Sequence, residues 1–342
     1  MPIDEITGDS LDRAVSIEMR FAHGLPRGVV APLYDAARAQ SGGSMTFRAA
    51  QALRARVSRG DHVLVVTGAG TAPWLPKGET DGPLGAAAVA RAVEIGLGAK
   101  PILVGEARNL PSSIGATQAA GLVVVDEDIF VQRTGCALAV PFPLGLEAGR
   151  VAAASLFDRF NPACIVFVEK GGPNEKGMFH SILGSGRTAD AMANCQLLAD
   201  LAAERGCLTI GIGDGGNEIG CGSIFEAVQR VQPFGRVCTC PCGAGVATVT
   251  RCDHLIFASV SNWGAYALAA ALGGLLDQPS VLHDAETELR MLHASLAGGA
   301  MDGAYAKLIP FVDGTNAGVQ VGIITMLHQI VANGQTNYER GF

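Results

Sequence analysis

Three side chains with oxygen donors are concentrated in one glycine-rich loop, GDGGNE at residues 213–218. Asp214, Asn217 and Glu218 carry carboxylate or amide oxygens, which are the ligands that hard divalent cations take in proteins. The glycines among them allow positive φ angles and let a ligand approach the backbone closely. The loop therefore predicts a site for a cation or a polar ligand, and the structural alternative is a tight turn with solvated acids.

A second segment, ETDGPLG at residues 79–85, places Thr80 and Asp81 directly before a stretch with helical spacing. Helix N-termini attract anions, because their first N–H groups are unpaired and the helix dipole is positive there. We therefore interpret Thr80 and Asp81 as candidates for binding a substrate carboxylate. The alternative is that Asp81 caps this helix, with Pro83 in its first turn.

The segment VEKGGPNEKGMFH, residues 168–180, combines acidic, basic and amide side chains. Glu169 and Lys170 follow a hydrophobic run directly, and successive side chains of extended backbone point to opposite sides, so at most one of them faces a cleft. Either is a candidate base, and Glu169 also a metal ligand. His180 is a candidate general acid or base, because an imidazole titrates near neutral pH, or a hydrogen-bonded structural histidine. Asn174 is a candidate for substrate binding.

Each of these segments follows a hydrophobic run that predicts a buried strand. Six such runs occur, at residues 63–66, 101–105, 122–128, 164–169, 208–213 and 254–260. Stretches with helical spacing alternate with them, which indicates βαβ crossovers. We therefore predict an α/β fold with a mainly parallel sheet flanked by helices. Residues 1–60 read as an N-terminal helical extension, and residues 61–342 as the α/β catalytic domain.

Ligands bind at the carboxyl ends of the strands of an open parallel sheet. Polar, glycine-rich segments follow the first, fourth and fifth of the predicted strands, and Ser261 and Asn262 follow the sixth. We therefore predict that these loops converge on one rim to form the active site of an enzyme, with Ser261 and Asn262 binding substrate. Two further Asp–Gly pairs, at Asp302 and Asp313, are interpreted as structural turns.

The composition restricts the classes of partner and the compartment. The net charge is −7 over 342 residues with no basic run, which argues against nucleic acid. No run reaches the roughly 18–20 apolar residues that a membrane span needs. The acidic N-terminus lacks the apolar stretch of a signal peptide, so we expect a cytoplasmic protein. Helices of small residues at 83–96 and 263–276 suit packing on the sheet or on another subunit, so a homo-oligomer is possible.

Nine cysteines, an odd number, favour reduced thiols over a disulfide framework. Cys238, Cys240 and Cys242 are clustered in RVCTCPCG. In an extended strand this spacing separates neighbouring thiols by about 6–7 Å, which is awkward for chelation. We therefore favour small half-buried residues of a β segment over a zinc site at these positions.

The segments ETDGPLGAAAVARAV, VEKGGPNEKGMFHSILG, TIGIGDGGNEIGCG, VSNWGAYALAAAL and GGAMDG…FVDG, in this order, resemble the C-terminal domain of the D-glutamate cyclase family. The resemblance implies a lyase that interconverts D-glutamate with 5-oxo-D-proline and water, or that forms or hydrolyses a related lactam. It also implies a divalent cation, Mn or Mg, held by hard ligands. Carried over by motif, the metal ligands are Asp81, Glu169, Asp214 and Glu218, and Asn217 belongs to the same site.

Lactam closure needs an unprotonated amine, a polarised γ-carboxyl group and the expulsion of water. Glu169, Glu218 or Lys170 is a candidate to accept the proton, and a cation would stabilise the oxyanion. Two other classes of function stay open at this point. Acid-lined glycine loops also bind phosphate through a metal, as in a metal-dependent phosphatase, and a non-catalytic protein that binds a small acid would have the same residues.

Overall fold

The computed structural model describes residues 2–19, 26–70 and 72–336, and it has the expected α/β fold. Seven strands form one sheet in the order β3-β4-β2-β1-β5-β8-β9, and every neighbouring pair is parallel. The strands are β1 (His62–Thr67), β2 (Lys100–Gly105), β3 (Val123–Val125), β4 (Cys136–Pro141), β5 (Cys164–Val168), β8 (Leu208–Gly213) and β9 (His254–Phe257).

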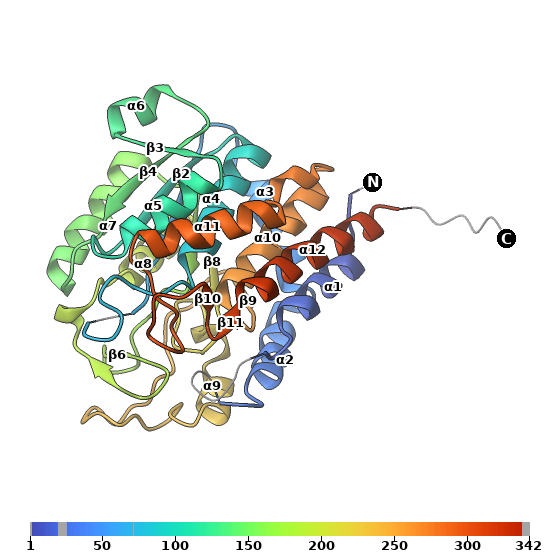
Figure 1. Ribbon diagram of the computed structural model, residues 1–342. Coiled ribbons are helices and arrows are strands. Elements are labelled where there is room, and N and C mark those ends of the chain that lie inside the picture. Colours follow the sequence, from blue (N-terminus) through green and yellow to red (C-terminus); the bar gives the residue numbers. More distant parts are fainter. Residues whose placement is uncertain (1, 20–25, 71, 337–342) are drawn as a thin grey trace.

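Helices cover both faces of this sheet (Figure 1). Over the described residues they are α1 (Glu5–Val15), α2 (Val30–Ser41), α3 (Met45–Arg56), α4 (Pro83–Leu97), α5 (Leu110–Ala119), α6 (Glu127–Gln132), α7 (Leu146–Phe160), α8 (Gln196–Arg205), α9 (Phe225–Val231), α10 (Ser261–Leu275), α11 (Ala285–Ala297) and α12 (Ala317–Gly334).

Alternating side chains of β1 show why both faces must be covered. Val63 and Val65 belong to the hydrophobic core beneath α4 and α10, whereas Leu64 and Val66 belong to the core beneath α7 and α8. Successive side chains of a strand point to opposite faces, so an all-apolar run needs a helical layer on each side. The sheet is therefore a rigid central layer whose strand ends can position a site.

Helix α10 is buried along its whole length, which is unusual for a helix of a globular protein. Small residues make this possible by letting α4 and α10 approach closely. A Cβ atom at Gly85 would lie 2.9 Å from Val168 Cγ1 and 3.0 Å from the Cβ of Ala265, so only glycine fits there without a shift. The N-termini of α4 and α10 consequently lie beside the end of β5.

The described part of residues 1–60 is largely helical, as the spacing predicts. Leu11, Leu33 and Leu53, from α1, α2 and α3, belong to the same core as α10. In Figure 1 α1 also lies alongside α12, near the C-terminal end of the described chain. The proposed division at residue 60 remains a prediction.

Two strand expectations need correction. The run at 122–128 forms only the three-residue β3, because its acidic end starts α6. The strand β4 was not expected, and it lies between β3 and β2. Two small hairpins, β6 (Phe179–His180) with β7 (Gly186–Arg187) and β10 (Phe311–Val312) with β11 (Thr315–Asn316), were not expected either.

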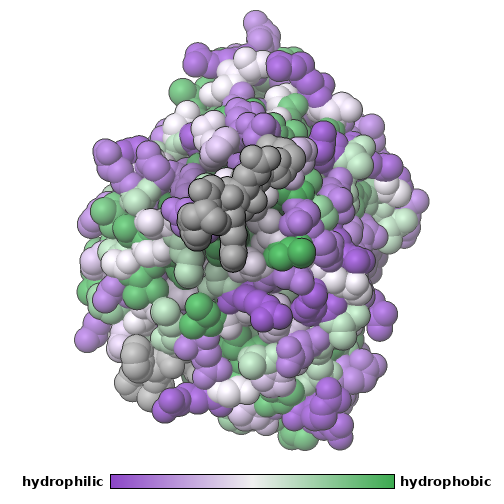
Figure 2. Space-filling model, turned by 90° about the vertical axis from the view of Figure 1, so that its right-hand side faces the viewer, coloured by the Kyte–Doolittle hydropathy of each residue, from purple (hydrophilic) through white to green (hydrophobic). Residues whose placement is uncertain are grey.

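The surface mixes polar and apolar side chains. Figure 2 shows hydrophilic and hydrophobic residues intermixed on the face turned toward the viewer. Among the described residues, none of the helices combines the length and the hydropathy that crossing a lipid bilayer requires. The homo-oligomer remains a prediction.

Candidate functional site

The loops that follow β1, β5 and β8 bring four of the predicted acids together. Carboxylate oxygens of Asp81, Asp214 and Asp313 lie within 4.8 Å of one another, and so do those of Glu169, Asp214 and Glu218. We call these five residues the acidic group. Because Asp214 belongs to both sets, the group is continuous, and its donors are the hard oxygens that Mn²⁺ and Mg²⁺ prefer.

Asp81 is held by α10, not by the helix that follows it in the sequence. Its Oδ2 accepts a hydrogen bond from Ser261 N and its Oδ1 one from Asn262 N, both at 2.8 Å. Asn262 Oδ1 in turn accepts from Gly82 N at 2.9 Å and from Gly85 N at 2.7 Å, at the start of α4. The idea that Asp81 caps the following helix is therefore corrected: the two segments cap each other's helices.

Glu169 has a left-handed backbone conformation, with φ of 48°, which is uncommon outside glycine. Its Oε2 accepts a 2.5 Å hydrogen bond from Ser261 Oγ. Burial, together with the negative charges of Asp214, Glu218 and Asp81, raises the pKa of Glu169 well above its ordinary value. A cation among these carboxylates would offset the repulsion, so the donor set fits a divalent metal.

Backbone N–H groups of the GDGGNE loop donate hydrogen bonds to the carboxylate of Glu218. Its Oε1 accepts a hydrogen bond from Gly215 N at 3.1 Å, and its Oε2 accepts one from Gly216 N at 2.8 Å. A Cβ atom at Gly213 would lie 2.7 Å from Glu218 Oε2, so the glycine leaves room for the carboxylate. The loop thus fixes Glu218 beside Asp214 at the end of β8.

Asp313 is the member of the acidic group that sequence reasoning missed. It lies in the turn between β10 and β11 with φ of 49°. Asp302, which is fully buried, holds this turn: its Oδ1 accepts from Gly314 N at 2.8 Å and its Oδ2 from Tyr305 N at 2.7 Å. The hydrogen bonds of Asp302 are structural, as its Asp–Gly sequence indicated. Asp313 is also followed by glycine, but its carboxylate belongs to the acidic group, and the Asp–Gly sequence alone does not reveal this difference.

Three candidates for substrate binding use their side chains in hydrogen bonds to neighbouring loops. Thr80 is buried and its Oγ1 donates to the carbonyl oxygen of Phe311 at 2.7 Å. Asn174 Nδ2 donates to Gly245 O at 2.8 Å, and Asn217 Nδ2 donates to the carbonyl oxygen at the end of β6 at 2.9 Å. These bonds position the loops around the acidic group, and contact with substrate remains a prediction.

Lys170 lies outside the acidic group, but the alternation expected of extended backbone does not apply to it and Glu169, because Glu169 has a left-handed backbone. It is buried, and its Nζ donates to Glu106 Oε2 at 2.6 Å and to Gly68 O at 2.9 Å. Burial by itself would lower the pKa of Lys170, but the Glu106 carboxylate raises it above its ordinary value. A lysine in this environment keeps its proton, which suits an ion pair better than a base.

A hollow of about 410 Å³ lies near this ion pair, where β2 and β4 end. Its lining includes Glu106, Arg108 and Phe142 and none of the acidic group. The hollow and the acidic group are therefore separate features of the same rim of the sheet.

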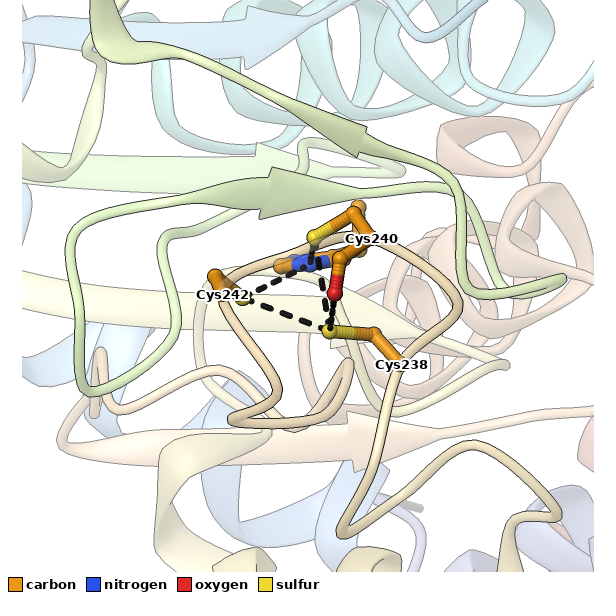
Figure 3. A group of neighbouring side chains, drawn as sticks. Cys238, Cys240 and Cys242 are labelled. Carbon is orange, nitrogen blue, oxygen red and sulfur yellow. Dashed lines mark hydrogen bonds between the residues drawn. The ribbon is translucent and has the colours of Figure 1, made fainter.

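His180 lies in a second cluster, with Cys238, Cys240 and Cys242, which we call the cysteine group. His180 Nε2 lies 3.3 Å from Cys240 Sγ and 3.5 Å from Cys242 Sγ. Cys238 Sγ lies 3.4 Å from Cys240 Sγ and 3.3 Å from Cys242 Sγ. Figure 3 shows the three cysteines turned toward a common centre.

The cysteine group corrects the expectation that these thiols lie along a β segment. Residues 237–243 form an irregular loop with a turn, so the alternation of an extended strand does not apply. Burial by itself would raise the pKa of the Cys238 thiol, but hydrogen bonds from Cys242 and Cys240 outweigh this effect and lower the pKa to about 6. His180 is thus engaged with sulfur atoms and is not among the acidic group.

Comparison with known proteins gives two findings. The profile of a protein family described as "D-glutamate cyclase-like, C-terminal" matches residues 34–328. The human protein named "D-glutamate cyclase, mitochondrial" is 35% identical over 145 residues, which cover 38% of this chain and 21% of the human protein. The matched region is therefore about a fifth of that relative. The expected cytoplasmic location of this chain remains a prediction.

Proposed function

The chain belongs to the D-glutamate cyclase-like C-terminal family, and from this premise we propose that it is a metal-assisted lyase interconverting D-glutamate with 5-oxo-D-proline and water. The observation that supports the proposal most strongly is the acidic group, in which residues from four separate loops bring carboxylates within ligand distance. A structural role would not require so many like charges to meet, because their repulsion costs free energy.

Asp81, Glu169, Asp214, Glu218 and Asp313 are the residues that would hold a divalent cation, Mn²⁺ or Mg²⁺. The cation would supply Lewis-acid polarisation of the γ-carboxyl group and would offset the charge of the carboxylates that hold it. In the cyclisation a C–N bond forms between the amine nitrogen and the carbon of the γ-carboxyl group (Cδ), a C–O bond of that carboxyl group breaks, and one water leaves. Proton transfer from nitrogen to the departing oxygen needs a residue that can take and return a proton.

We assign this proton transfer to Glu169 or Glu218. Ser261 Oγ orients one oxygen of Glu169, and the backbone N–H groups of residues 215 and 216 orient Glu218. Groups held in this way lose little entropy when substrate binds. Lys170 has a positioning role in this proposal, because its ion pair with Glu106 fixes the backbone next to Glu169.

The test uses the purified full chain with D-glutamate or 5-oxo-D-proline, in Mn²⁺, in Mg²⁺ and after removal of metal by a chelator. We expect conversion in both directions by mass spectrometry and chiral chromatography, loss of conversion with chelator, and recovery when Mn²⁺ is returned. No conversion of either compound with Mn²⁺ present would overturn the assignment. Release of phosphate from phosphate esters, or tight binding of a small acid without product, would then identify the phosphatase or the binding protein.

A further inference from the structure

The cysteine group joins two segments that are distant in the sequence. His180 comes from the β6–β7 hairpin, and Cys238, Cys240 and Cys242 come from the loop that follows α9. One ligand atom from each of the four residues lies within 4.8 Å of all the others. All three cysteines are free thiols. Four soft or borderline donors therefore surround one point, in a region separate from the hard carboxylates of the acidic group.

The spacing of these donors is close to that of tetrahedral coordination. Zn–S bonds of about 2.3 Å and Zn–N bonds of about 2.0–2.1 Å place the sulfurs of a tetrahedral site about 3.8 Å apart and a sulfur and a nitrogen about 3.5 Å apart. Two of the three Sγ···Sγ separations are 3.3 and 3.4 Å, and two of the three Nε2···Sγ separations are 3.3 and 3.5 Å. The sulfurs therefore lie slightly closer together than in a zinc-bound site, and a small outward movement would admit the ion. A disulfide, with sulfurs about 2 Å apart, would leave the third thiol and the imidazole outside it.

The surrounding backbone is built to bring the thiols together. Thr239, between two of the cysteines, is fixed to the hairpin because its N and Oγ1 both donate to Gly184 O, at 3.1 and 2.9 Å. A Cβ atom at Gly186 would lie 2.5 Å from Cys240 Sγ, so the hairpin leaves that space to the sulfur. Asn174 Nδ2 lies 3.5 Å from Cys242 Sγ, which suits a donor to a thiolate.

We propose that His180, Cys238, Cys240 and Cys242 form a structural zinc site. The Cys₃His set is one of the closed, four-ligand combinations of structural zinc, and thiolate with imidazole selects zinc over the magnesium and manganese that suit carboxylates. With four protein ligands the ion has no open position for substrate. In this assignment His180 is a positioning residue and not a proton carrier.

The zinc site supports the acidic group through one hydrogen bond. The carbonyl oxygen of His180 accepts from Asn217 Nδ2 at 2.9 Å, and Asn217 directly precedes Glu218. The backbone of Asn217 also accepts from Gly172 N at 2.8 Å. Zinc would thus fix the hairpin against the GDGGNE loop and limit the movement of Glu218.

The test measures bound metal in the full chain, purified without a metal-binding tag under reducing conditions. We expect about one zinc per chain by elemental analysis after dialysis, whether or not D-glutamate is converted, so this test is independent of the proposed function. Cys240→Ser should reduce the zinc content at least tenfold, whereas the matched variant Cys252→Ser, outside the cysteine group, should leave it unchanged.

Cobalt gives a second measurement that does not depend on any variant folding. Co²⁺ bound by the wild-type chain should produce thiolate-to-cobalt charge-transfer absorption and the intense visible bands of a tetrahedral site, and added Zn²⁺ should remove both. Three results would overturn the proposal: no zinc retained when zinc is supplied, equal zinc in Cys240→Ser and Cys252→Ser, or only octahedral cobalt absorption.

Discussion

The acidic group and the cysteine group differ in both their donors and their supports. The acidic group has five carboxylates. Glu169, Asp214 and Glu218 lie in the loops that follow β5 and β8, and Asp81 caps helix α10, which packs on the sheet. The cysteine group has sulfur and imidazole donors carried by a hairpin and an irregular loop. Hard donors on a rigid rim suit chemistry on a bound ligand, and soft donors between loops suit a structural ion. If both proposed sites bind their metals, this fold separates two metal chemistries by the type of donor.

The largest expected effect comes from removing the residue that both acidic sets share. Asp214→Asn should lower the rate of D-glutamate conversion by about 10³-fold, because it removes a charged ligand from the centre of the group. Zinc content should stay at the wild-type value, since the cysteine group is separate. The exposed Glu226→Gln is the control for a lost carboxylate. A simultaneous loss of zinc would show that the two regions are not independent.

Glu169 should make the free energy of unfolding of the protein depend on metal and on pH. Its raised pKa means that the folded chain binds more protons than the unfolded chain between pH 4.5 and the folded pKa, so stability falls as pH rises through that window. Without metal, Glu169→Gln should therefore increase the free energy of unfolding by about 1 kcal/mol at pH 8 and by much less at pH 5.

The order of stability should reverse when Mn²⁺ is added. Binding to the native state stabilises the wild type, and the variant, which lacks one ligand charge, gains less. Urea unfolding of wild type and variant at both pH values, each with chelator and with Mn²⁺, measures the free energy of unfolding under all four conditions. A variant that is less stable than wild type at pH 8 without metal would contradict the assigned repulsion among the carboxylates.

The sequence predicted the acidic group better than the cysteine group for a physical reason. Asp81, Glu169 and Asp214 lie in loops that follow buried parallel strands, and parallel strands must place those loops on one rim. Asp313 lies in a small hairpin outside the sheet, so no such rule applies to it. The positions of the cysteines are set by a turn in which Thr239 is hydrogen-bonded to Gly184, 55 residues away in the sequence. The local spacing of the cysteines cannot predict that contact.

Asn217 connects the two regions by a hydrogen bond, so its removal tests the coupling. Asn217→Ala deletes the hydrogen bond to the His180 carbonyl and should lower the rate about tenfold, with a loss of about 1 kcal/mol in stability. Zinc should still bind, because no ligand is removed. Elemental analysis beside steady-state kinetics measures both, and an unchanged rate would show that the cysteine group does not position Glu218.

The smallest effect is expected from Ser261→Ala, which separates two contacts that one residue makes within the acidic group. The backbone N–H of Ser261 donates to Asp81 Oδ2 and survives the substitution, whereas the hydroxyl bond to Glu169 Oε2 is lost. One hydrogen bond to a carboxylate is worth about 1 kcal/mol, so the Mn²⁺ concentration for half-maximal activity should rise about fivefold. The helix cap remains, so thermal stability without metal should change little. An unchanged Mn²⁺ requirement would mean that Glu169 is oriented by its left-handed backbone alone, and a loss as large as that of Asp214→Asn would mean that the hydroxyl acts on the substrate itself.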